Sequence, residues 1–461
     1  MKRYSAILLA GLAALALGAP DSPPGSALAD YVAEPDASFE WRIRRRYSEP
    51  RAEIIELYMQ SQTWRGIAWK HQLYLIKSVS LGTDVRQGLL VIGGGRWSER
   101  YQDEIGAPLP EGSELFVEIA NRLGTFVAVL GQVPFQPSFG LTEDHLIAHS
   151  LEQYLASGDS EWPLLLPMVK SAVRAMDATQ AATAAEWGAA LERFTVLGGS
   201  KRGWTAWLTG AVDLRAAILV PLVIDALNFA EHMPHQTAVW GAPSDELSPY
   251  SERGLVDVLA AKSGAGADLR TIVDPYSYRE RLTQPKLIVV ATNDAYFPLD
   301  SMNLYWNDLP GPKYALYLPN EGHDIEDPGR LIATLNAVHR SAASGGELPD
   351  LAWQFERYGE VLRLCLRAEP VPASVLVWTA VSADADFRNV EFVPAPVTPG
   401  DDILVFDLPP AEDGFRAVFA ESIFGEGDAQ YSLSTNVRIV AAAGEVPDSA
   451  ASIDGTPGVC P

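Results

Sequence analysis

The stretch of sequence that decides the fold runs from Phe194 to Trp207 and reads FTVLGGSKRGWTAW. Residues 194–197 are apolar or β-branched, which is typical of a strand buried on both faces. A helical pattern begins at Trp204. Ser200 therefore lies in a glycine-framed turn between a strand and a helix. A Ser in such a turn has an exposed hydroxyl beside a helix N-terminus, whose N–H groups stabilise a nearby oxyanion.

This turn matches the nucleophile-elbow pattern G-x-S-x-G incompletely. Gly198 and Ser200 fit the pattern, but Arg202 occupies the position of the second Gly. Gly203 follows one residue later. We therefore expect either that the Arg202 side chain points outward or that the turn has a different geometry. The alternative is a tight turn without chemistry, or a loop that cradles a phosphate.

Strands and helices alternate on both sides of the turn, which predicts an α/β fold with a mostly parallel, doubly wound sheet of the α/β-hydrolase type. An antiparallel pair is predicted first, over 54–63 and 69–79. Further strands are predicted over 88–92, 125–133, 216–224, 286–291 and 314–318. Helices are predicted over 113–122, 164–177 and 332–340.

Two polar residues follow predicted strands downstream of Ser200. Asp294 comes just after 286–291, and His323 lies in a Gly-framed loop after 314–318. The chain order Ser, Asp, His is the order that α/β-hydrolases use. His323 can take the Ser200 proton near neutral pH, and Asp294 can fix the histidine tautomer. The alternative candidates for the acid are Asp225, Asp300 and Asp324.

Other candidate residues concern the oxyanion and the substrate. The backbone N–H groups of Lys201, Gly94 and Gly95 are candidates for an oxyanion hole, with an ordinary Gly turn as the alternative for the two glycines. Residues 228–284 form a long insertion between two predicted strands, and we expect a helical cap over the site there. The candidate substrate-binding residues are Arg202, Trp204, Asp225 and Tyr296.

The amino-acid composition limits the classes of protein to which the chain can belong. The chain has 461 residues, of which 48% are hydrophobic and 20% charged, so it is globular and long enough for a large and a small domain. Its net charge of −24 argues against nucleic acid or anionic lipid as a partner. We expect neither a metal nor an organic cofactor. His145 and His149 are four residues apart, but the Glu of a zincin motif is missing between them.

The N-terminus has the features of a signal peptide over residues 1–29. A basic start precedes an apolar run over 6–17, and Ala27-Leu28-Ala29 is a small-x-small cleavage site. Cleavage there would leave Asp30 as the first residue, with Leu17-Gly18-Ala19 as a weaker alternative. No later segment is apolar enough to span a bilayer. We therefore expect export to the periplasm or the medium.

The residue pattern of the chain changes after the last predicted helix. We assign 30–345 to the α/β-hydrolase domain. Short alternating runs, punctuated by Pro and Gly, predict a small all-β sandwich of immunoglobulin or fibronectin type over 346–442. We expect a polar tail over 443–461. Cys365 and Cys460 either form a disulfide or remain two free thiols.

Several longer runs give the chain a specific resemblance. They are Ser61-Gln62-Thr63-Trp64, Glu143-Asp144, Ile147-Ala148, Trp162-Pro163, Leu166 to Lys170, Ala175-Met176-Asp177, Gly199 to Trp204, Asp225 with Asn228, Pro285-Lys286, Asn293-Asp294, and Pro319-Asn320 with Gly322-His323. Over most of its mature length the chain resembles the PhoPQ-activated pathogenicity-related proteins, a family similar to α/β-hydrolases. The resemblance implies the fold, an elbow at Ser200 and the partners Asp294 and His323. Some members look like dipeptidyl or prolyl peptidases, which implies a peptidase or amidase.

The sequence thus predicts an exported serine hydrolase that cleaves an acyl bond of a peptide or an ester through an acyl-enzyme. A carboxylesterase is the first alternative. A non-catalytic binding or signalling protein on a hydrolase scaffold is the second, because a fold does not imply an activity.

Overall fold

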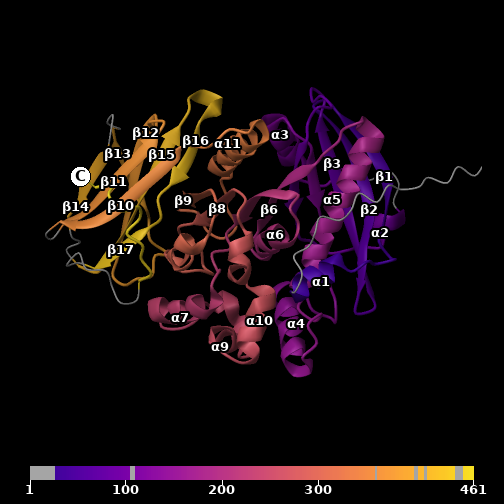
Figure 1. Cartoon of the computed structure of the whole chain (residues 1–461), viewed down its shortest axis with the longest axis horizontal. Helices are drawn as coiled ribbons and strands as arrows, with labels where there is room; N and C mark the ends of the chain where they lie inside the picture. Colours follow the sequence, from indigo (N-terminus) through magenta and orange to yellow (C-terminus); the bar gives the residue numbers. More distant parts are fainter. Residues whose placement is uncertain are drawn as a thin grey trace, which may run out of the picture.

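The molecule is built on one long sheet (Figure 1). The computed structural model describes residues 26–103, 109–358, 361–398, 403–409, 413–441 and 450–460. Within these residues, the strands of this sheet are, in spatial order, β1 (Glu40–Glu49), β2 (Ala52–Trp64), β3 (Ile67–Ser78), β5 (Val127–Leu130), β4 (Gln87–Ile92), β6 (Arg193–Gly199), β7 (Ala216–Leu222), β8 (Lys286–Ala291), β9 (Lys313–Leu318), β16 (Tyr431–Ser434), β15 (Phe415–Phe424), β12 (Ser374–Ser382) and β13 (Val393–Val397). One more strand, β17 (Arg438–Ala441), pairs with β15.

The middle of the sheet is parallel, as the sequence predicts. Strands β5, β4, β6, β7, β8 and β9 pair in parallel with one another. The predicted antiparallel pair is also present as β2 and β3, which turn at Arg65 and Gly66. The sequence analysis did not identify β1, an edge strand that carries four arginines. Parallel strands end at one edge, so this arrangement brings the loops after β4, β6, β7, β8 and β9 together.

Helices cover both faces of the parallel strands. Helices α3 (Ser113–Leu123) and α11 (Gly329–Ser344) pack with one set of strand side chains, which includes Leu89 and Val91. Helices α1 (Ala27–Ala33), α5 (Leu165–Trp187) and α6 (Lys201–Val212) pack on the other face with Leu90 and Ile92. Alternate residues of one strand thus enter two separate cores, as the pleat requires.

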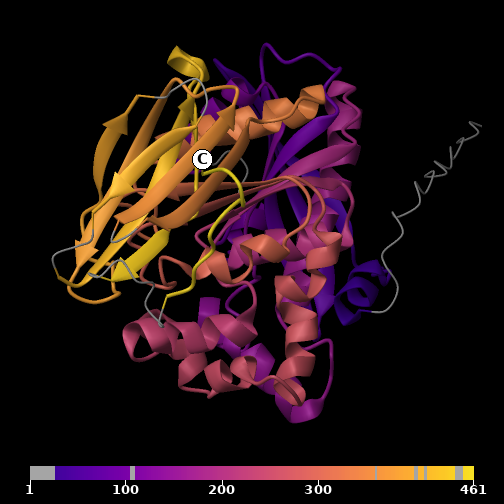
Figure 2. The same ribbon diagram turned by 60° about the vertical axis from the view of Figure 1, so that its left-hand side comes forward.

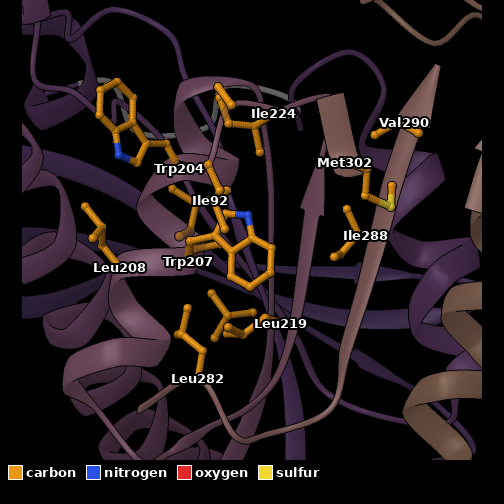
Figure 3. Close-up of a cluster of buried hydrophobic side chains, with 14 of the residues drawn as sticks. Ile92, Trp204, Trp207, Leu208, Leu219, Ile224, Leu282, Ile288, Val290 and Met302 are labelled. Carbon is orange, nitrogen blue, oxygen red and sulfur yellow. The ribbon is translucent and has the colours of Figure 1, made fainter. Parts of the chain in front are cut away.

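A buried cluster holds the helix that follows the elbow against the sheet (Figure 3). Trp207 of α6 is fully buried and lies among strand residues that include Ile92, Leu219 and Ile288. Large buried aromatic side chains contribute several kcal/mol, about 3–5 when they are cut back to Ala. The start of α6, and with it Ser200, is therefore fixed by the core.

Between β7 and β8 the chain forms only helices, in the segment predicted as a helical insertion. They are α7 (Phe229–Trp240), η1 (Asp245–Leu247), α8 (Ser248–Ser251), α9 (Leu255–Ala260), α10 (Ala265–Val273) and η2 (Pro275–Arg281). Together with α4 (Glu143–Ser157), which contacts α8 and α10, they gather on one side of the sheet, below it in Figure 1. The shorter remaining helices are α2 (Arg100–Asp103), η3 (Ser301–Leu304), η4 (Trp306–Asp308) and η5 (Gly427–Ala429).

The C-terminal strands, in the segment predicted as a small all-β sandwich over 346–442, are joined to the central sheet. They form two layers at one end of the molecule (Figure 2). One layer is the three-stranded sheet of β10 (Asp350–Tyr358), β11 (Val361–Glu369) and β14 (Leu404–Leu408). The other layer continues the central sheet, because β16 pairs with β9 at Ser434 and Ala315. The physical reason is that β9 would otherwise be an unpaired edge strand.

The predicted polar tail over 443–461 contains apolar residues that are buried in the described part of the chain. Residues 443–449 lie outside the described residues, but Ile453 and Val459 are buried. Gly455 forms a β-bridge with Gln354 of β10. Cys365 and Cys460 form a disulfide with a Cα–Cα distance of 5.2 Å. The apolar residues of the tail therefore pack on the three-stranded sheet, and the disulfide anchors its end.

The expected cleavage site after Ala29 conflicts with helix α1. Residues 1–25 of the predicted signal peptide lie outside the described residues. Ser26 caps α1, and Leu28 and Ala29 are buried in the core. Cleavage after Ala29 would remove the cap and a fully buried Leu from the folded protein. In the part of the chain that the structure describes, no helix is long and apolar enough to cross a membrane.

Candidate active site

Ser200 lies at a sharp turn between β6 and α6. Its φ and ψ are 54° and −128°, a conformation that non-glycine residues rarely adopt. A Cβ on Gly198 would overlap the carbonyl of Arg202. A Cβ on Gly203 would lie 2.7 Å from the Ile224 side chain and 2.8 Å from the Gly198 oxygen. The second glycine that the elbow needs is therefore Gly203, one residue beyond the general pattern.

Ser200, His323 and Asp294 form one hydrogen-bonded chain. The Nε2 atom of His323 lies 2.9 Å from the Ser200 hydroxyl. On the other side of the ring, Nδ1 lies 2.9 and 3.1 Å from the two carboxylate oxygens of Asp294. Asp294 is buried, whereas His323 is partly exposed. The structure thus places a serine hydroxyl, an imidazole and a carboxylate in the mutual geometry that a catalytic triad has.

The three alternative acids lie elsewhere. Asp225 is buried and accepts a hydrogen bond of 2.5 Å from the Tyr305 hydroxyl. Burial, together with the nearby charge of Asp294, raises the pKa of Asp225 to about 8. Asp300 pairs with His235 at 2.7 Å. Asp324 is exposed. Asp225 therefore lies in the core and is not among the residues that line the pocket beside Ser200. Its role in substrate binding stays a prediction.

The Arg202 side chain turns toward Val133 and Glu143, and Arg202 is not among the residues that line the pocket beside Ser200. Its role in substrate binding stays a prediction. Its Nε donates to the Val133 carbonyl at 2.6 Å, and its guanidinium pairs with Glu143 at 2.8 Å. Lys201 Nζ pairs with Glu143 at 3.0 Å and with Asp144 at 2.8 Å. Burial alone would raise the pKa of Glu143, but the Arg202 and Lys201 cations lower it to about 2. These ion pairs tie the elbow to the start of α4.

Gly94 and Gly95 follow β4, the strand beside β6. Ile92, the last residue of β4, pairs in register with Gly198. A Cβ on Gly94 would lie 2.7 Å from the guanidinium carbon of Arg202, so the loop packs directly on the first turn of α6. The carbonyls of Gly94 and Gly95 accept bonds from the Gln132 N–H and the Gln136 side chain. The loop is thus held beside the elbow by its carbonyl groups.

An apolar pocket adjoins Ser200 on the side of the insertion helices. Trp204 and Tyr296, two predicted substrate-binding residues, both line it. Trp204 donates its Nε1 hydrogen to the Val273 carbonyl at 2.5 Å and packs edge-on against Phe229. The Tyr296 ring lies 4.1 Å from the His323 ring, centroid to centroid. Tyr296 therefore contacts the base as well as the pocket.

The family model of the PhoPQ-activated pathogenicity-related proteins matches residues 28–388. The chain belongs to this family. Autocrine proliferation repressor protein A from Dictyostelium discoideum is a curated relative, 29% identical over 466 residues, which are 90% of this chain and 90% of the relative. The match begins at Leu28, within α1. The helix is therefore part of what the family shares, and it is not only part of a leader.

Solved structures similar to this PhoPQ-related chain include two esterases. Acetyl xylan esterase 1 from Thermoanaerobacterium sp. JW/SL YS485 is 17% identical, with 69% of this chain and 92% of that chain covered and a TM-score of 0.45. A glucuronoyl esterase from Solibacter usitatus is 13% identical, with 69% and 91% covered and a TM-score of 0.40.

The structural role of Glu143 in this PhoPQ-related chain was not predicted from the sequence. Glu143 has a φ of +51°, and its backbone N–H donates to the Gln136 side chain at 2.8 Å. The Glu143-Asp144 run was one of the signals for the family, but a run of two acids does not show which cations it meets. Among the described residues, no group of three or more His, Cys, Asp or Glu side chains could hold a metal ion.

Proposed function

We propose that this chain is a serine hydrolase that cleaves an acyl bond with Ser200 as nucleophile, His323 as base and Asp294 as orienting acid. The observation that carries the proposal is the continuous hydrogen-bonded chain from Ser200 through His323 to Asp294, with distances of 2.9 Å at both ends. A Ser hydroxyl becomes a good nucleophile only when a base takes its proton.

The reaction follows from this geometry. Ser200 Oγ attacks the acyl carbon while its proton passes to His323 Nε2. His323 then gives that proton to the leaving amine or alcohol, and an acyl-enzyme remains. Water attacks the acyl-enzyme with His323 again as base, which restores Ser200. Asp294 holds Nδ1–H throughout and stabilises the imidazolium.

The proposed oxyanion hole uses the backbone N–H of Lys201 and the loop of Gly94 and Gly95. Lys201 is the first residue of α6, where N–H groups have no partner within the helix. The packing of Gly94 on Arg202 supports the placement of the second donor beside the elbow. Removing one such donor typically costs about 10²–10³ in kcat.

For the scissile bond, we propose a peptide or amide, on the resemblance of some family members to peptidases. A carboxyl ester is the alternative, since the same triad hydrolyses both. For location, we propose export to the periplasm or medium. The Cys365–Cys460 disulfide supports this, because structural disulfides persist in oxidising compartments.

Fluorophosphonate labelling of the purified protein, beside Ser200→Ala, tests the proposal. We expect labelling of the parent protein and none of the variant. Matched p-nitrophenyl esters and peptide p-nitroanilides then assign the bond class. Absence of labelling in a protein with native circular dichroism would contradict the covalent mechanism and favour a binding or signalling role. The relative from Dictyostelium discoideum is named an autocrine proliferation repressor.

A further inference from the structure

The pocket beside Ser200 has walls from several elements. Ile224 and Leu227 follow β7, Phe229 and Met233 come from α7, and Leu259 comes from α9. The insertion helices therefore supply most of the surface that faces a group bound next to the nucleophile. These five side chains are at most 8% exposed, so the walls that they form are apolar and largely shielded from solvent.

The charges at the pocket are already paired. Asp144 accepts a bond from the Tyr250 hydroxyl at 3.0 Å through one oxygen, and its other oxygen pairs with Lys201 at 2.8 Å. Lys201 also pairs with Glu143 at 3.0 Å. A charged substrate group in this pocket would lose its hydration and gain no free counter-charge, which is strongly unfavourable.

We propose that this pocket is the specificity subsite and that it takes an uncharged, apolar group joined to the scissile acyl bond. The inference rests on the proposed function, since it names the substrate class of the same site. An aliphatic or aromatic group gains from every methylene that leaves water, and the pocket offers apolar contacts on several sides.

A series of p-nitrophenyl esters from acetyl to hexanoyl, hydrolysed by the full mature protein, tests the subsite from the acyl side. A series of alkyl acetates from methyl to hexyl tests it from the alcohol side. In one of the two series, kcat/KM is expected to rise about fourfold for each added methylene until the chain fills the pocket. The series that rises identifies the side of the bond that the pocket holds. Flat or falling values in both series would overturn the inference.

Two variants on one helix give a matched comparison. Leu259 and Leu255 both lie on α9 and are 3% and 1% exposed, but only Leu259 lines the pocket. Leu259→Ala is expected to move the preferred chain to a greater length, because it deepens the pocket. Leu255→Ala is expected to leave the chain-length profile unchanged. The same profile in both variants and the parent would contradict the assignment.

The two proposals fail in different ways. If neither fluorophosphonate nor p-nitrophenyl acetate reacts in a Ser200-dependent manner, the proposed function fails. If acetyl ester hydrolysis depends on Ser200 but no series shows a chain-length preference, the hydrolase stands and the apolar subsite fails. Should Leu259→Ala not fold, Met233→Ala replaces it, with the same expected shift toward longer chains.

Discussion

At the scale of single residues, the structure separates the predicted acid, Asp294, from its rival Asp225. Asp294 and Asp225 each follow a strand of the parallel sheet, and both are buried. Only Asp294 bonds the His323 ring. Asp225 bonds Tyr305, and burial raises its pKa to about 8, so near neutral pH it is largely protonated. The amide of Asn resembles a protonated carboxyl group in shape.

Two Asn variants should therefore behave differently. Asp294→Asn is expected to lower kcat by about 10⁴-fold, because the amide favours the wrong histidine tautomer. Asp225→Asn is expected to change kcat by less than about tenfold, because the amide replaces a protonated acid. The measurement is p-nitrophenyl acetate turnover with fluorophosphonate labelling as a count of active sites. Equal losses in the two variants would show that both carboxyl groups serve His323.

At the scale of elements, the elbow depends on how closely α6 approaches β6 and β7. Gly203 lies at the closest point, against Gly198 and Ile224. Gly199 precedes Ser200 and has open space at its Cβ position. The contrast explains how this elbow accommodates Arg202: that side chain turns toward Val133 and Glu143, and small residues are needed at 198 and 203 rather than at 202.

Alanine substitutions at these two glycines provide a stability test. Gly203→Ala is expected to destabilise the fold by about 1–3 kcal/mol, the usual cost of overpacking. Gly199→Ala is expected to cost under about 1 kcal/mol, because the added methyl meets no atom within 4 Å. Urea unfolding followed by circular dichroism measures both. A larger loss for Gly199→Ala would show that the turn, rather than the helix approach, limits the elbow.

Helix α1 leads to a prediction about maturation. Lys170 on α5 donates from Nζ to the Tyr31 and Glu34 carbonyls at 3.1 and 2.7 Å, which anchors the end of α1. Ser26 and Leu28 hold its start. We therefore expect the first residue of the proposed mature protein at or before Ser26. Intact-mass measurement of the protein from its native compartment checks this, and a mass that begins at Asp30 would contradict it.

At the scale of the whole molecule, three histidines are buried in neutral form. Burial lowers the pKa of His71 to about 4, of His232 to about 3 and of His339 to about 4. An unfolded chain protonates these groups near pH 6.5. Their contribution to stability is therefore complete above pH 6.5 and is lost as the pH falls toward 4, since only the unfolded state gains protons.

Each of these histidines should contribute separately to the pH dependence of the free energy of unfolding. The free energy of unfolding is expected to fall between pH 6.5 and 4, and His339→Gln should reduce the slope by up to about 1.4 kcal/mol per pH unit. The matched control is the same substitution at an exposed position, His145→Gln, measured in parallel. Chemical denaturation at several pH values gives the slopes. An unchanged slope in His339→Gln would contradict the buried neutral state.

The parts of the molecule that could be predicted from the sequence are those with a local pattern. Strand β8 and the residues Ser200, Asp294 and His323 follow from apolar runs and from what comes after them. Strand β1 was missed because its arginines hide the alternation, and the structure pairs Arg44 with Glu56 at 3.1 Å. No local pattern marks such distant pairs.

The same limit applies to pairings across the molecule. The role of the Ser61-Gln62 run could not be predicted, because it depends on a contact with α5. The Gln62 side chain donates to the Pro167 carbonyl of that helix at 2.7 Å. The extension of the sheet rests on the pairing of Ser434 with Ala315, which lie far apart in the sequence. The sequence could not decide whether Cys365 and Cys460 form a disulfide, because it does not show how far apart they lie in space.

The pairing of β16 with β9 also sets the order in which the protein can be completed. Strand β9 ends at Leu318, but its neighbour begins only at Tyr431, and the cysteine that secures the tail is Cys460, the last residue but one. A chain that emerges from the N-terminus can form the parallel strands early, yet it exposes the edge of β9 until Tyr431–Ser434 have been delivered. Newly made chains therefore remain vulnerable at that edge until β16 has emerged, and a chain that stops at residue 345 keeps the vulnerability permanently.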